Sequence, residues 1–279
     1  MTVALSPDLV GTELPSRSTS WTKHDVILYA VGVGARPDNG LDFIYEGRGP
    51  KVLPTYAVVP GMNIIGALGS VIEMDMSRLL HGEQGITLHR PLPPAATVTS
   101  TSRIVEVWDK GKAAVVGMEG VCSDEEGPLF SVYSSLFIIG GGGFGGERGP
   151  SSSKAALPDR DPDHVVEDAT RPEQAAVYRL SGDRNPMHID PDFATKAGFA
   201  GPFLHGLCTY GFAGRAVLDR LCGGDPVRFG GFRVRFADQV WPGDTIVTKI
   251  WDTGDGTAHV QAETQKGNVV LSQATAEYR

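Results

Sequence analysis

The chain matches itself when it is shifted by 148 to 149 positions, and this internal repeat is the feature that most limits the folds it can adopt. Tyr29 falls on Tyr178, and Pro54 falls on Pro202. Further matches, in the same order, are Ile86, Leu88, Leu92 and Pro94 on Val234, Phe236, Val240 and Pro242, and Val107-Trp108-Asp109-x-Gly111 on Ile250-Trp251-Asp252-x-Gly254. The repeat predicts two halves built to one pattern.

A segment rich in glycine, proline and serine separates the two halves, over residues 140–156. This composition disfavours a helix or an interior strand and is typical of a linker. The segment lacks the Gly-Lys-Ser/Thr ending of a phosphate-binding loop, so its glycines indicate flexibility rather than catalysis. We therefore predict an N-terminal domain over residues 1–139, a linker over 140–156 and a C-terminal domain over 157–279.

The sequence pattern of each half predicts a short helix, a loop and an apolar central helix. A run of strands joined by turns that contain glycine is predicted to follow. The central helices are expected over residues 56–68 and 207–221. The second half predicts strands over residues 232–236, 245–249, 258–262 and 269–278. A long helix on an antiparallel sheet, present twice, is an α+β fold.

The composition narrows the functional classes. Of the 279 residues, 41% are hydrophobic and 21% are charged, as in soluble globular proteins, and residues 1–20 do not resemble a secretion signal. We therefore expect a cytoplasmic protein. The net charge of −8 disfavours binding to nucleic acid or to an anionic membrane. Cys122, Cys208 and Cys222 include no Cys-x-x-Cys pair, which predicts reduced cysteines and no zinc ribbon.

The chemically densest stretch holds Asp183, Asn185-Pro186 and His188. Asp183 and His188 are five residues apart, a spacing that brings them together on neither a helix nor a strand. Asn185-Pro186 predicts a turn, which can direct both side chains into one pocket. An acid and an imidazole flanking one water molecule can move its protons near neutral pH. The alternative is an Asx-turn with a surface histidine.

The repeat also indicates which half is active. Asp183 maps to Gly34, and His188 maps to Asn39, so the first half lacks the acid and the base. His205-Gly206 maps to Ala57-Val58. We expect one site in the second half, with the first half making room for a ligand chain. His205 is expected to serve in packing or in support of the helix start.

The assembled motifs resemble the hydratase 2 family, the MaoC-like (R)-specific 2-enoyl-CoA hydratases. The resemblance runs nearly end to end and rests on Tyr178-x-Leu-Ser-Gly-Asp183-x-Asn185-Pro186-x-His188, Leu204-His205-Gly206-Leu207-Cys208-Thr209-Tyr210-Gly211, Tyr29-Ala-Val-Gly-Val-Gly, Leu53-Pro54-Thr55-Tyr56 and Leu80-His81-Gly82-Glu83-Gln84. It implies a double hot-dog fold with one active site per chain. It also implies a homodimer and a role in fatty-acid β-oxidation.

The same resemblance implies syn addition of water to a trans-2-enoyl-CoA, without a metal or a cofactor apart from the CoA of the substrate. Asp183 and His188 would be the catalytic pair, with His188 as the base and Asp183 as the proton donor to Cα after a relay. Asn185 would hold the water. A backbone N–H at a helix start suits an oxyanion, and Gly206 fits that role. His81, Gly82, Lys110 and Phe236 would contact substrate, with Lys110 at a CoA phosphate and Phe236 beside the thioester or pantetheine.

Two other functions remain open from the sequence. Hot-dog folds also host acyl-CoA thioesterases, which aim water at the carbonyl carbon. A non-catalytic acyl-CoA-binding subunit is the third possibility, although the intact pair of Asp183 and His188 argues against it. The length and branching of the acyl chain are left open, as is the choice between CoA and an acyl-carrier protein.

Overall fold

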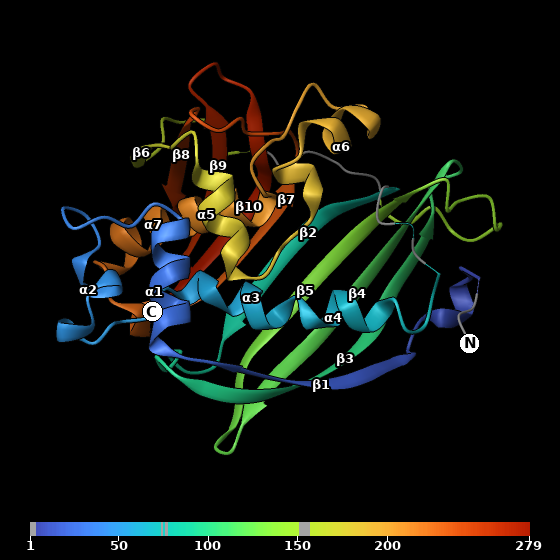
Figure 1. Cartoon of the computed structure of the whole chain (residues 1–279), viewed down its shortest axis with the longest axis horizontal. Helices are drawn as coiled ribbons and strands as arrows, with labels where there is room; N and C mark the ends of the chain where they lie inside the picture. Colours follow the sequence, from blue (N-terminus) through green and yellow to red (C-terminus); the bar gives the residue numbers. More distant parts are fainter. Residues whose placement is uncertain (1–3, 74, 76–77, 151–156) are drawn as a thin grey trace.

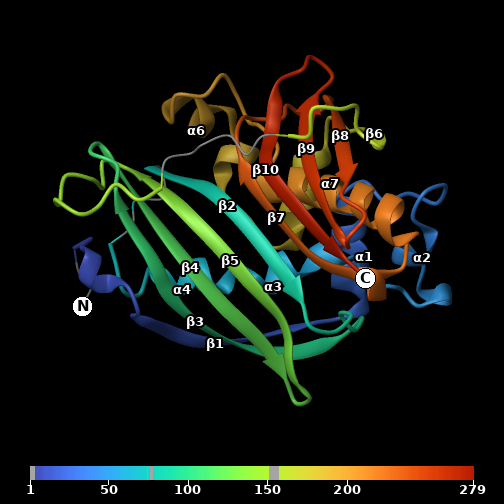
Figure 2. The same cartoon turned by 180° about the vertical axis from the view of Figure 1, so that it is seen from behind.

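The computed structural model describes residues 4–73, 75, 78–150 and 157–279. In this part of the chain, ten strands form one sheet in the order β1-β3-β4-β5-β2-β7-β10-β9-β8-β6 (Figures 1 and 2). All neighbouring strands are antiparallel. The order is symmetrical about the β2–β7 junction. Each strand of the first half and the strand whose number is higher by five lie at equal distances from this junction, as β1 and β6 do at the two edges of the sheet.

Each half contributes five strands to this sheet. They are β1 (Glu13–Trp21), β2 (Leu79–Leu88), β3 (Ala96–Asp109), β4 (Ala113–Asp124), β5 (Gly127–Ile139), β6 (His164–Ala169), β7 (Phe229–Phe236), β8 (Thr245–Asp252), β9 (Thr257–Thr264) and β10 (Val269–Tyr278). The predicted strands of the second half are confirmed, and the last one has the predicted bounds. The two halves meet along β2 and β7, where Ile86 lies opposite Phe232 in the sheet core.

The helices lie mostly on one face of this sheet, as Figure 1 shows. The α-helices are α1 (Lys23–Gly32), α2 (Leu41–Ile44), α3 (Val58–Gly61), α4 (Asn63–Leu68), α5 (Gln174–Tyr178), α6 (Pro191–Lys196) and α7 (Gly206–Cys222). The 3-10 helices are η1 (Pro7–Leu9), η2 (Glu46–Arg48), η3 (Pro54–Ala57), η5 (Arg179–Ser181), η6 (Pro186–His188) and η7 (Pro226–Arg228). No helix in the described residues has both the length and the apolar character needed to cross a bilayer.

The central helix of the second half is continuous, as predicted. Helix α7 ends at Gly223, which adopts the left-handed conformation common after helices. Its interior glycines allow the first half to approach closely. A Cβ atom on Gly211 would lie 2.4 Å from Val33 Cγ1, and one on Gly214 would lie 2.3 Å from Thr55 Cγ2. The helix is therefore packed against both its own strands and the other half.

The central helix of the first half is not the continuous helix that residues 56–68 predict. It is divided into η3, α3 and α4. Pro60 has no amide hydrogen, so it cannot donate to the Tyr56 carbonyl as a continuous helix would require. The amides of Ile65 and Gly66 both donate to the Met62 carbonyl, which marks the second break. The prediction of one continuous helix was wrong. It relied on the apolar composition of residues 56–68 and did not weigh the effect of Pro60 on the hydrogen bonds of the helix.

Aromatic side chains fill the junction between the halves. The duplicated residues Tyr29 and Tyr178 contact each other, with ring centroids 6.1 Å apart. Tyr56 packs edge-on against Tyr29 at 5.4 Å and against Trp21 at 5.7 Å. Tyr178 in turn lies 5.0 Å from His205. A continuous row of buried rings therefore connects the core of the first half with the second half.

The described part of the predicted linker is held in place over residues 140–150. The carboxylate of Asp109 accepts hydrogen bonds from the amides of Gly111, Gly143 and Gly145, at 2.8 to 2.9 Å. Gly143 and Gly145 of the predicted linker thus supply amide donors to this carboxylate, and the flexibility of the linker stays a prediction. The rest of the predicted linker, residues 151–156, lies outside the described residues.

Candidate active site

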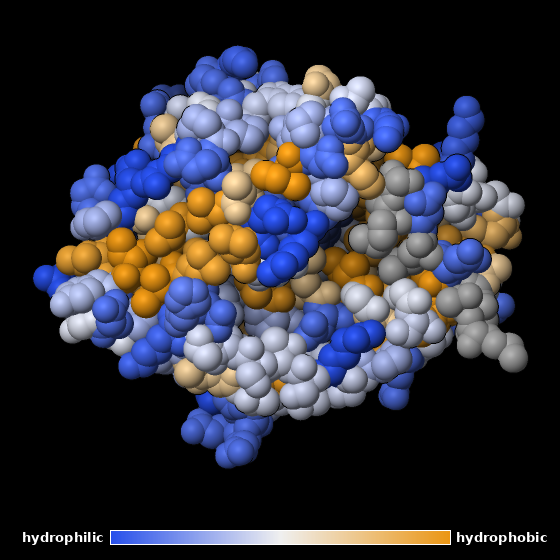
Figure 3. Space-filling view, viewed as in Figure 1, coloured by the Kyte–Doolittle hydropathy of each residue, from blue (hydrophilic) through white to orange (hydrophobic). Residues whose placement is uncertain are grey.

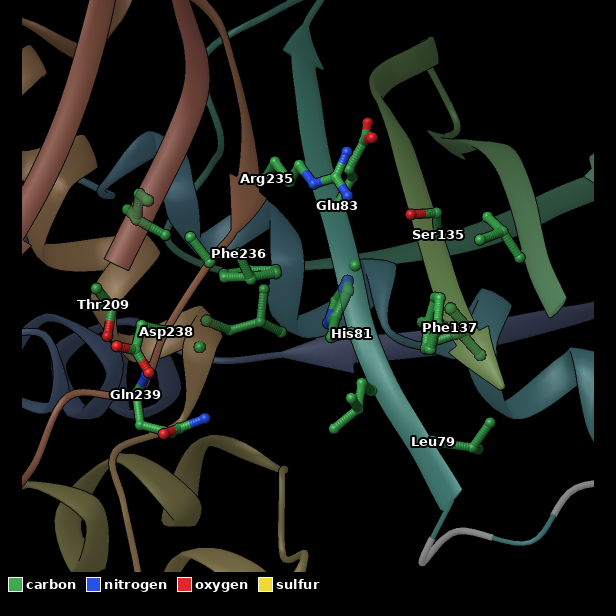
Figure 4. A pocket seen from close by; sticks show the side chains of 18 of the residues that line it. Leu79, His81, Glu83, Ser135, Phe137, Thr209, Arg235, Phe236, Asp238 and Gln239 are labelled. Carbon is green, nitrogen blue, oxygen red and sulfur yellow. The ribbon is translucent and has the colours of Figure 1, made fainter. Parts of the chain in front are cut away.

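All eight predicted site residues line one pocket of about 1010 Å³. They are His81, Gly82, Lys110, Asp183, Asn185, His188, Gly206 and Phe236. Figure 4 shows His81 on β2 and Phe236 on β7 in this pocket, at the junction of the two halves. The structure therefore brings together residues that are up to 155 positions apart in the sequence (236 − 81).

The turn that carries the acid and the base is built from local hydrogen bonds. Gly182 has φ +129°, a conformation that favours glycine, and it ends η5. The Asp183 carboxylate accepts from the Asn185 amide at 3.1 Å. The Asn185 side-chain oxygen accepts from the Met187 amide at 3.1 Å and so caps η6. Asn185 also lines the pocket, and this bond occupies its side-chain oxygen rather than its NH2 group.

The orientation of His188 fixes which ring nitrogen can act as a base. Its Nδ1 atom lies 2.9 Å from the Phe203 carbonyl oxygen. A carbonyl oxygen only accepts, so Nδ1 carries the hydrogen and Nε2 keeps a free lone pair. Burial lowers the pKa of His188, although the bond to Phe203 and the charge of Asp183 raise it in part. The imidazole is therefore neutral near neutral pH, as a general base must be.

Asp183, His188 and His205 form one compact group. One carboxylate oxygen and one nitrogen from each ring lie within 4.8 Å of one another. A water molecule with two hydrogen bonds of about 2.8 Å can span such a gap. Among the described residues this is also the one group with the spacing to hold a metal ion. The expectation that the site uses no metal stays a prediction.

His205 contacts both of the other members of this group. Its Nε2 atom lies 3.1 Å from the Asp183 backbone carbonyl, and its ring packs on that of His188 with centroids 3.9 Å apart. His205 is only 1% exposed, and burial lowers its pKa to about 3. It stands at the N-cap of α7 without a side-chain capping bond. Of the two expected roles, the structure supports packing, and the contacts with Asp183 and His188 were not predicted.

Gly206, Phe236 and His81 surround the space beside this group. Gly206 is the first residue of α7, where an amide has no acceptor within the helix. A Cβ atom on Gly206 would lie 3.1 Å from two atoms of the Phe236 ring. The Phe236 ring packs edge-on against His81 at 5.0 Å. The Nε2 atom of His81 is buried and has no hydrogen-bond partner among the described residues, and burial lowers its pKa to about 4.

Gly82 and Lys110 lie on the side of the pocket formed by the first half. Gly82 is the extra residue of a bulge between β2 and β5, and a Cβ atom there would lie 2.9 Å from Ser135 Oγ. The ammonium group of Lys110 donates to the backbone carbonyls of Arg148 and Pro150. Arg148 and Arg235 also line this pocket. Burial and these two guanidinium groups lower the pKa of Lys110.

The duplicated positions in the first half lie outside this pocket. The Asn39 side-chain oxygen accepts from the Arg36 amide at 2.9 Å and so closes a surface turn. Gly34 packs under α7, because a Cβ atom there would lie 2.3 Å from the Phe212 ring. Neither position offers an acid or a base.

Sequence reasoning missed the contribution of the linker to the pocket. Arg148, Gly149 and Pro150 line it together with Glu106 and Trp108 of β3. The sequence signal that could have predicted this contribution is Asp109 in the β3–β4 hairpin. Its carboxylate accepts hydrogen bonds from the amides of Gly143 and Gly145 in the linker. The distance in sequence, more than thirty residues, hides such a contact from local patterns.

A double hot-dog protein is the class that this fold defines, and in the described residues an acid and two histidines of the second half meet at its pocket. Two family models match the chain, the MFE-2 hydratase 2 N-terminal domain over residues 20–140 and the MaoC like domain over residues 153–274. The 3-hydroxyacyl-thioester dehydratase Y of Mycobacterium tuberculosis is 42% identical over 99% of both chains. The chain belongs to the MaoC-like hydratase 2 family.

Other known proteins agree with this assignment. The peroxisomal multifunctional enzyme type 2 of Mus musculus is 42% identical over 95% of this chain, which spans only 37% of that longer protein. The crystal structure of a MaoC-like dehydratase from Phytophthora capsici superposes with a TM-score of 0.88 at 34% identity, covering 99% of this chain and 98% of that one. A Mycobacterium tuberculosis structure described as a double hotdog fold, at TM-score 0.58 and 14% identity over 96% of this chain and 97% of that one, bears on the fold alone.

Proposed function

We propose that the chain is an (R)-specific 2-enoyl-CoA hydratase that adds water reversibly and syn to trans-2-enoyl-CoA. The observation that carries this proposal is that the Asp183 carboxylate and the His188 ring, whose ligand atoms lie within 4.8 Å of each other, both line one large pocket. Relatives named enoyl-CoA hydratase 2, from Dictyostelium discoideum and Arabidopsis thaliana, support the reaction type. The product would be an (R)-3-hydroxyacyl-CoA.

The proposed proton path begins at His188. Its free Nε2 atom accepts a proton as the water oxygen bonds to Cβ of the enoyl group. The electrons of the carbon–carbon double bond move to the thioester oxygen. The proton then passes from His188 to the Asp183 carboxylate and on to Cα, which leaves both groups in their starting protonation states. Because both groups stand at the same wall, hydrogen and hydroxyl arrive on the same face.

The negative charge on the thioester oxygen needs a donor close to the same wall. The Gly206 amide at the start of α7 is well placed for this role, because a helix N-terminus directs unpaired N–H groups and a positive dipole end outward. Phe236 would position the thioester against this amide, since its ring packs directly on Gly206. Asn185 would hold the water through its side-chain NH2 group, because its oxygen is already bonded.

The acyl chain would extend into the first half of the chain. Met62, Ile65 and Leu136 line the same pocket and are apolar. Met62 lies between α3 and α4, so the divided helix of the first half contributes directly to the wall of this pocket. This arrangement supports the proposed division of labour, with an acyl-binding domain over residues 1–139, a linker over 140–156 and a catalytic domain over 157–279.

The reaction can be tested with crotonyl-CoA. Hydration removes the enoyl absorbance without releasing a thiol, whereas a thioesterase would release free CoA thiol. We expect loss of absorbance and no thiol signal. Thiol release at the rate of absorbance loss would favour the thioesterase, and no reaction with either readout would favour a non-catalytic binding subunit.

We further propose that the chain forms a homodimer and acts in the cytoplasm. Figure 3 shows hydrophobic side chains gathered over the region of α1 and α2, and an apolar surface of this kind supports association. Light scattering coupled to size exclusion tests the dimer, which a monomer mass would refute. Several relatives carry the word peroxisomal in their names, so fractionation of cells is needed to test the compartment.

A further inference from the structure

Three cationic side chains, Lys110, Arg148 and Arg235, line one side of the pocket, and we call them the cation cluster. Among the described residues, none of the three forms an ion pair with a carboxylate. Two acids line the pocket beside them, but both have other partners. Glu83 pairs with Arg233 at 2.8 Å, and Glu106 accepts from the hydroxyl of Tyr133 and the indole of Trp108. The three cationic side chains are therefore gathered in one pocket of a protein of net charge −8, where the carboxylate of Glu106 acts on the charge of Lys110 without an ion pair.

The backbone around Arg148 is fixed by contacts on both sides. The Asp109 carboxylate binds the amides of Gly143 and Gly145, and the Asp109 amide donates to the Glu147 carbonyl at 2.8 Å. Gly149 lies directly on the indole of Trp108, because a Cβ atom on it would come within 2.3 Å of the ring. Its φ of +65° also favours glycine.

Lys110, which directly follows Asp109 at the end of β3, also holds this segment in place. Its ammonium group binds the carbonyls of Arg148 and Pro150, so it holds the linker and stands beside the Arg148 guanidinium at the same time. Arg235 comes from β7, opposite Glu83 of β2, as Figure 4 shows. Three separate segments of the chain therefore each contribute a cation to one pocket, and apolar side chains such as Met62, Ile65 and Leu136 line the same pocket. An elongated ligand with an anionic end and an apolar end matches this polarity.

We propose that the cation cluster recognises the phosphates of coenzyme A, and that Arg148 of the linker is a specificity-determining residue for this carrier. The inference rests on the proposed function. A guanidinium group binds phosphate oxygens through paired hydrogen bonds, which makes arginine well suited to this ligand. Burial first, and then the charges of Arg148 and Arg235, lower the pKa of Lys110, and a bound polyanion would offset the repulsion among the three cations. Asp109 then acts as a positioning residue, because it holds the segment that carries Arg148.

The test compares thioesters that differ only in their phosphates. Crotonyl-CoA, crotonyl-3′-dephospho-CoA and crotonyl-pantetheine, which has no phosphate, are given to the wild type and to Arg148→Gln. We expect the variant to raise KM for crotonyl-CoA about tenfold, which corresponds to about 1.4 kcal/mol, with kcat unchanged. Its KM for crotonyl-pantetheine should equal that of the wild type. The dephospho compound assigns the effect to the 3′-phosphate or to the diphosphate.

Two further variants sharpen the comparison. Arg220→Gln removes an exposed arginine of α7 that lies outside the pocket, and it should leave all constants unchanged. Asp109→Asn should raise KM for crotonyl-CoA and not for crotonyl-pantetheine, a difference that simple destabilisation of the fold would not produce. Equal effects of Arg148→Gln on both thioesters, or no effect on either, would overturn the inference. Turnover only of a crotonyl group on an acyl-carrier protein would overturn it as well.

Failure of the proposed function can be recognised separately. If the wild type hydrates none of the thioesters, the proposed reaction is wrong, and calorimetric binding of CoA itself then tests the cation cluster. Weaker binding of CoA by Arg148→Gln than by Arg220→Gln would support the inference without any turnover. Equal affinities would overturn it.

Discussion

His188 owes its proposed role to one hydrogen bond made by its other nitrogen. Because Nδ1 donates to the Phe203 carbonyl, Nε2 stays free of hydrogen and is available to the water. His205 packs on the same ring and holds the backbone carbonyl of Asp183. The base, the acid and their support are therefore mutually positioned by contacts that span only 22 residues of sequence (205 − 183).

Loss of either member of the pair should remove most activity. We expect Asp183→Asn and His188→Ala to fold normally and to lower kcat for crotonyl-CoA by several orders of magnitude, because both groups belong to one proton path. Asn39→Ala, at the duplicated position, is the matched control and should keep near-normal kcat. Near-normal turnover by either site variant, or a comparable loss of kcat in soluble Asn39→Ala, would contradict the assignment of a single site.

Substitution of Gly206 should affect catalysis more than folding. In Gly206→Val, the new side chain would crowd Phe236, whose ring atoms lie 3.1 Å from the Cβ position, and would displace the thioester from the amide. Loss of one oxyanion donor typically lowers kcat by about 10²–10³. The measurement is kcat beside a thermal melt of the same preparation. Unchanged turnover with an intact melt would exclude Gly206 as the donor.

Buried neutral histidines should make the fold sensitive to acid. Burial lowers the pKa of His205 to about 3 and that of His81 to about 4, while an unfolded histidine titrates near 6.5. Between these values the unfolded chain binds more protons, so the free energy of unfolding falls as the pH falls from 6.5 toward 4. Each histidine contributes a slope of up to about 1.4 kcal/mol per pH unit. Denaturant unfolding of the wild type and of His205→Gln across this range should give a shallower slope in the variant, and equal slopes would contradict the account.

At the scale of the elements, the two central helices differ although they occupy repeated positions. Helix α7 is continuous and carries the start of the site at Gly206. Its counterpart is divided between Ala57 and Val58 and again at Met62, and Met62 lines the proposed acyl pocket.

The close contact of α7 with the first half gives an element-scale prediction. Gly214→Ala should lower the melting temperature, because its Cβ atom would lie 2.3 Å from Thr55, and overpacking typically costs about 1–3 kcal/mol. The matched control is Gly66→Ala in α4, where a Cβ atom meets nothing within 4 Å. That change should be neutral or slightly stabilising, since alanine favours a helix. A melt of Gly214→Ala equal to that of the wild type would contradict the packing.

Local sequence patterns predicted those features that depend on neighbours in the sequence. Alternation along the strands and the helical spacing of α7 located these elements, and Asn185-Pro186 located the turn. Pro60, which lies in α3, was a local signal against one continuous helix that the helix prediction did not weigh. The anchoring of the linker by Asp109 and the packing of His205 under His188 depend on contacts between distant segments. The periodicity of apolar residues along the sequence carries no information on such contacts, so they were identified only from the structure.

At the scale of the whole molecule, two similar halves meet edge to edge along β2 and β7, and we propose different roles for them. The β2–β7 junction closes one sheet, and the residues on both sides of it form a single pocket. The proposed substrate would lie across this junction, with its acyl chain in the first half, its reacting carbons at Asp183 and His188, and its phosphates at the linker. The two halves are therefore expected to act together on one substrate molecule.

The stereochemical course of hydration tests this account most directly. Crotonyl-CoA is hydrated in D₂O, and the 3-hydroxybutyryl-CoA is analysed for the configuration at Cβ and for the position of deuterium at Cα. Because water and proton come from the same wall of the pocket, we predict that deuterium and hydroxyl are added syn, and the assignment to hydratase 2 predicts the (R) product. Anti addition would contradict the assignment of Asp183 and His188 as one proton path, and an (S) product would contradict the proposed (R)-specific hydratase.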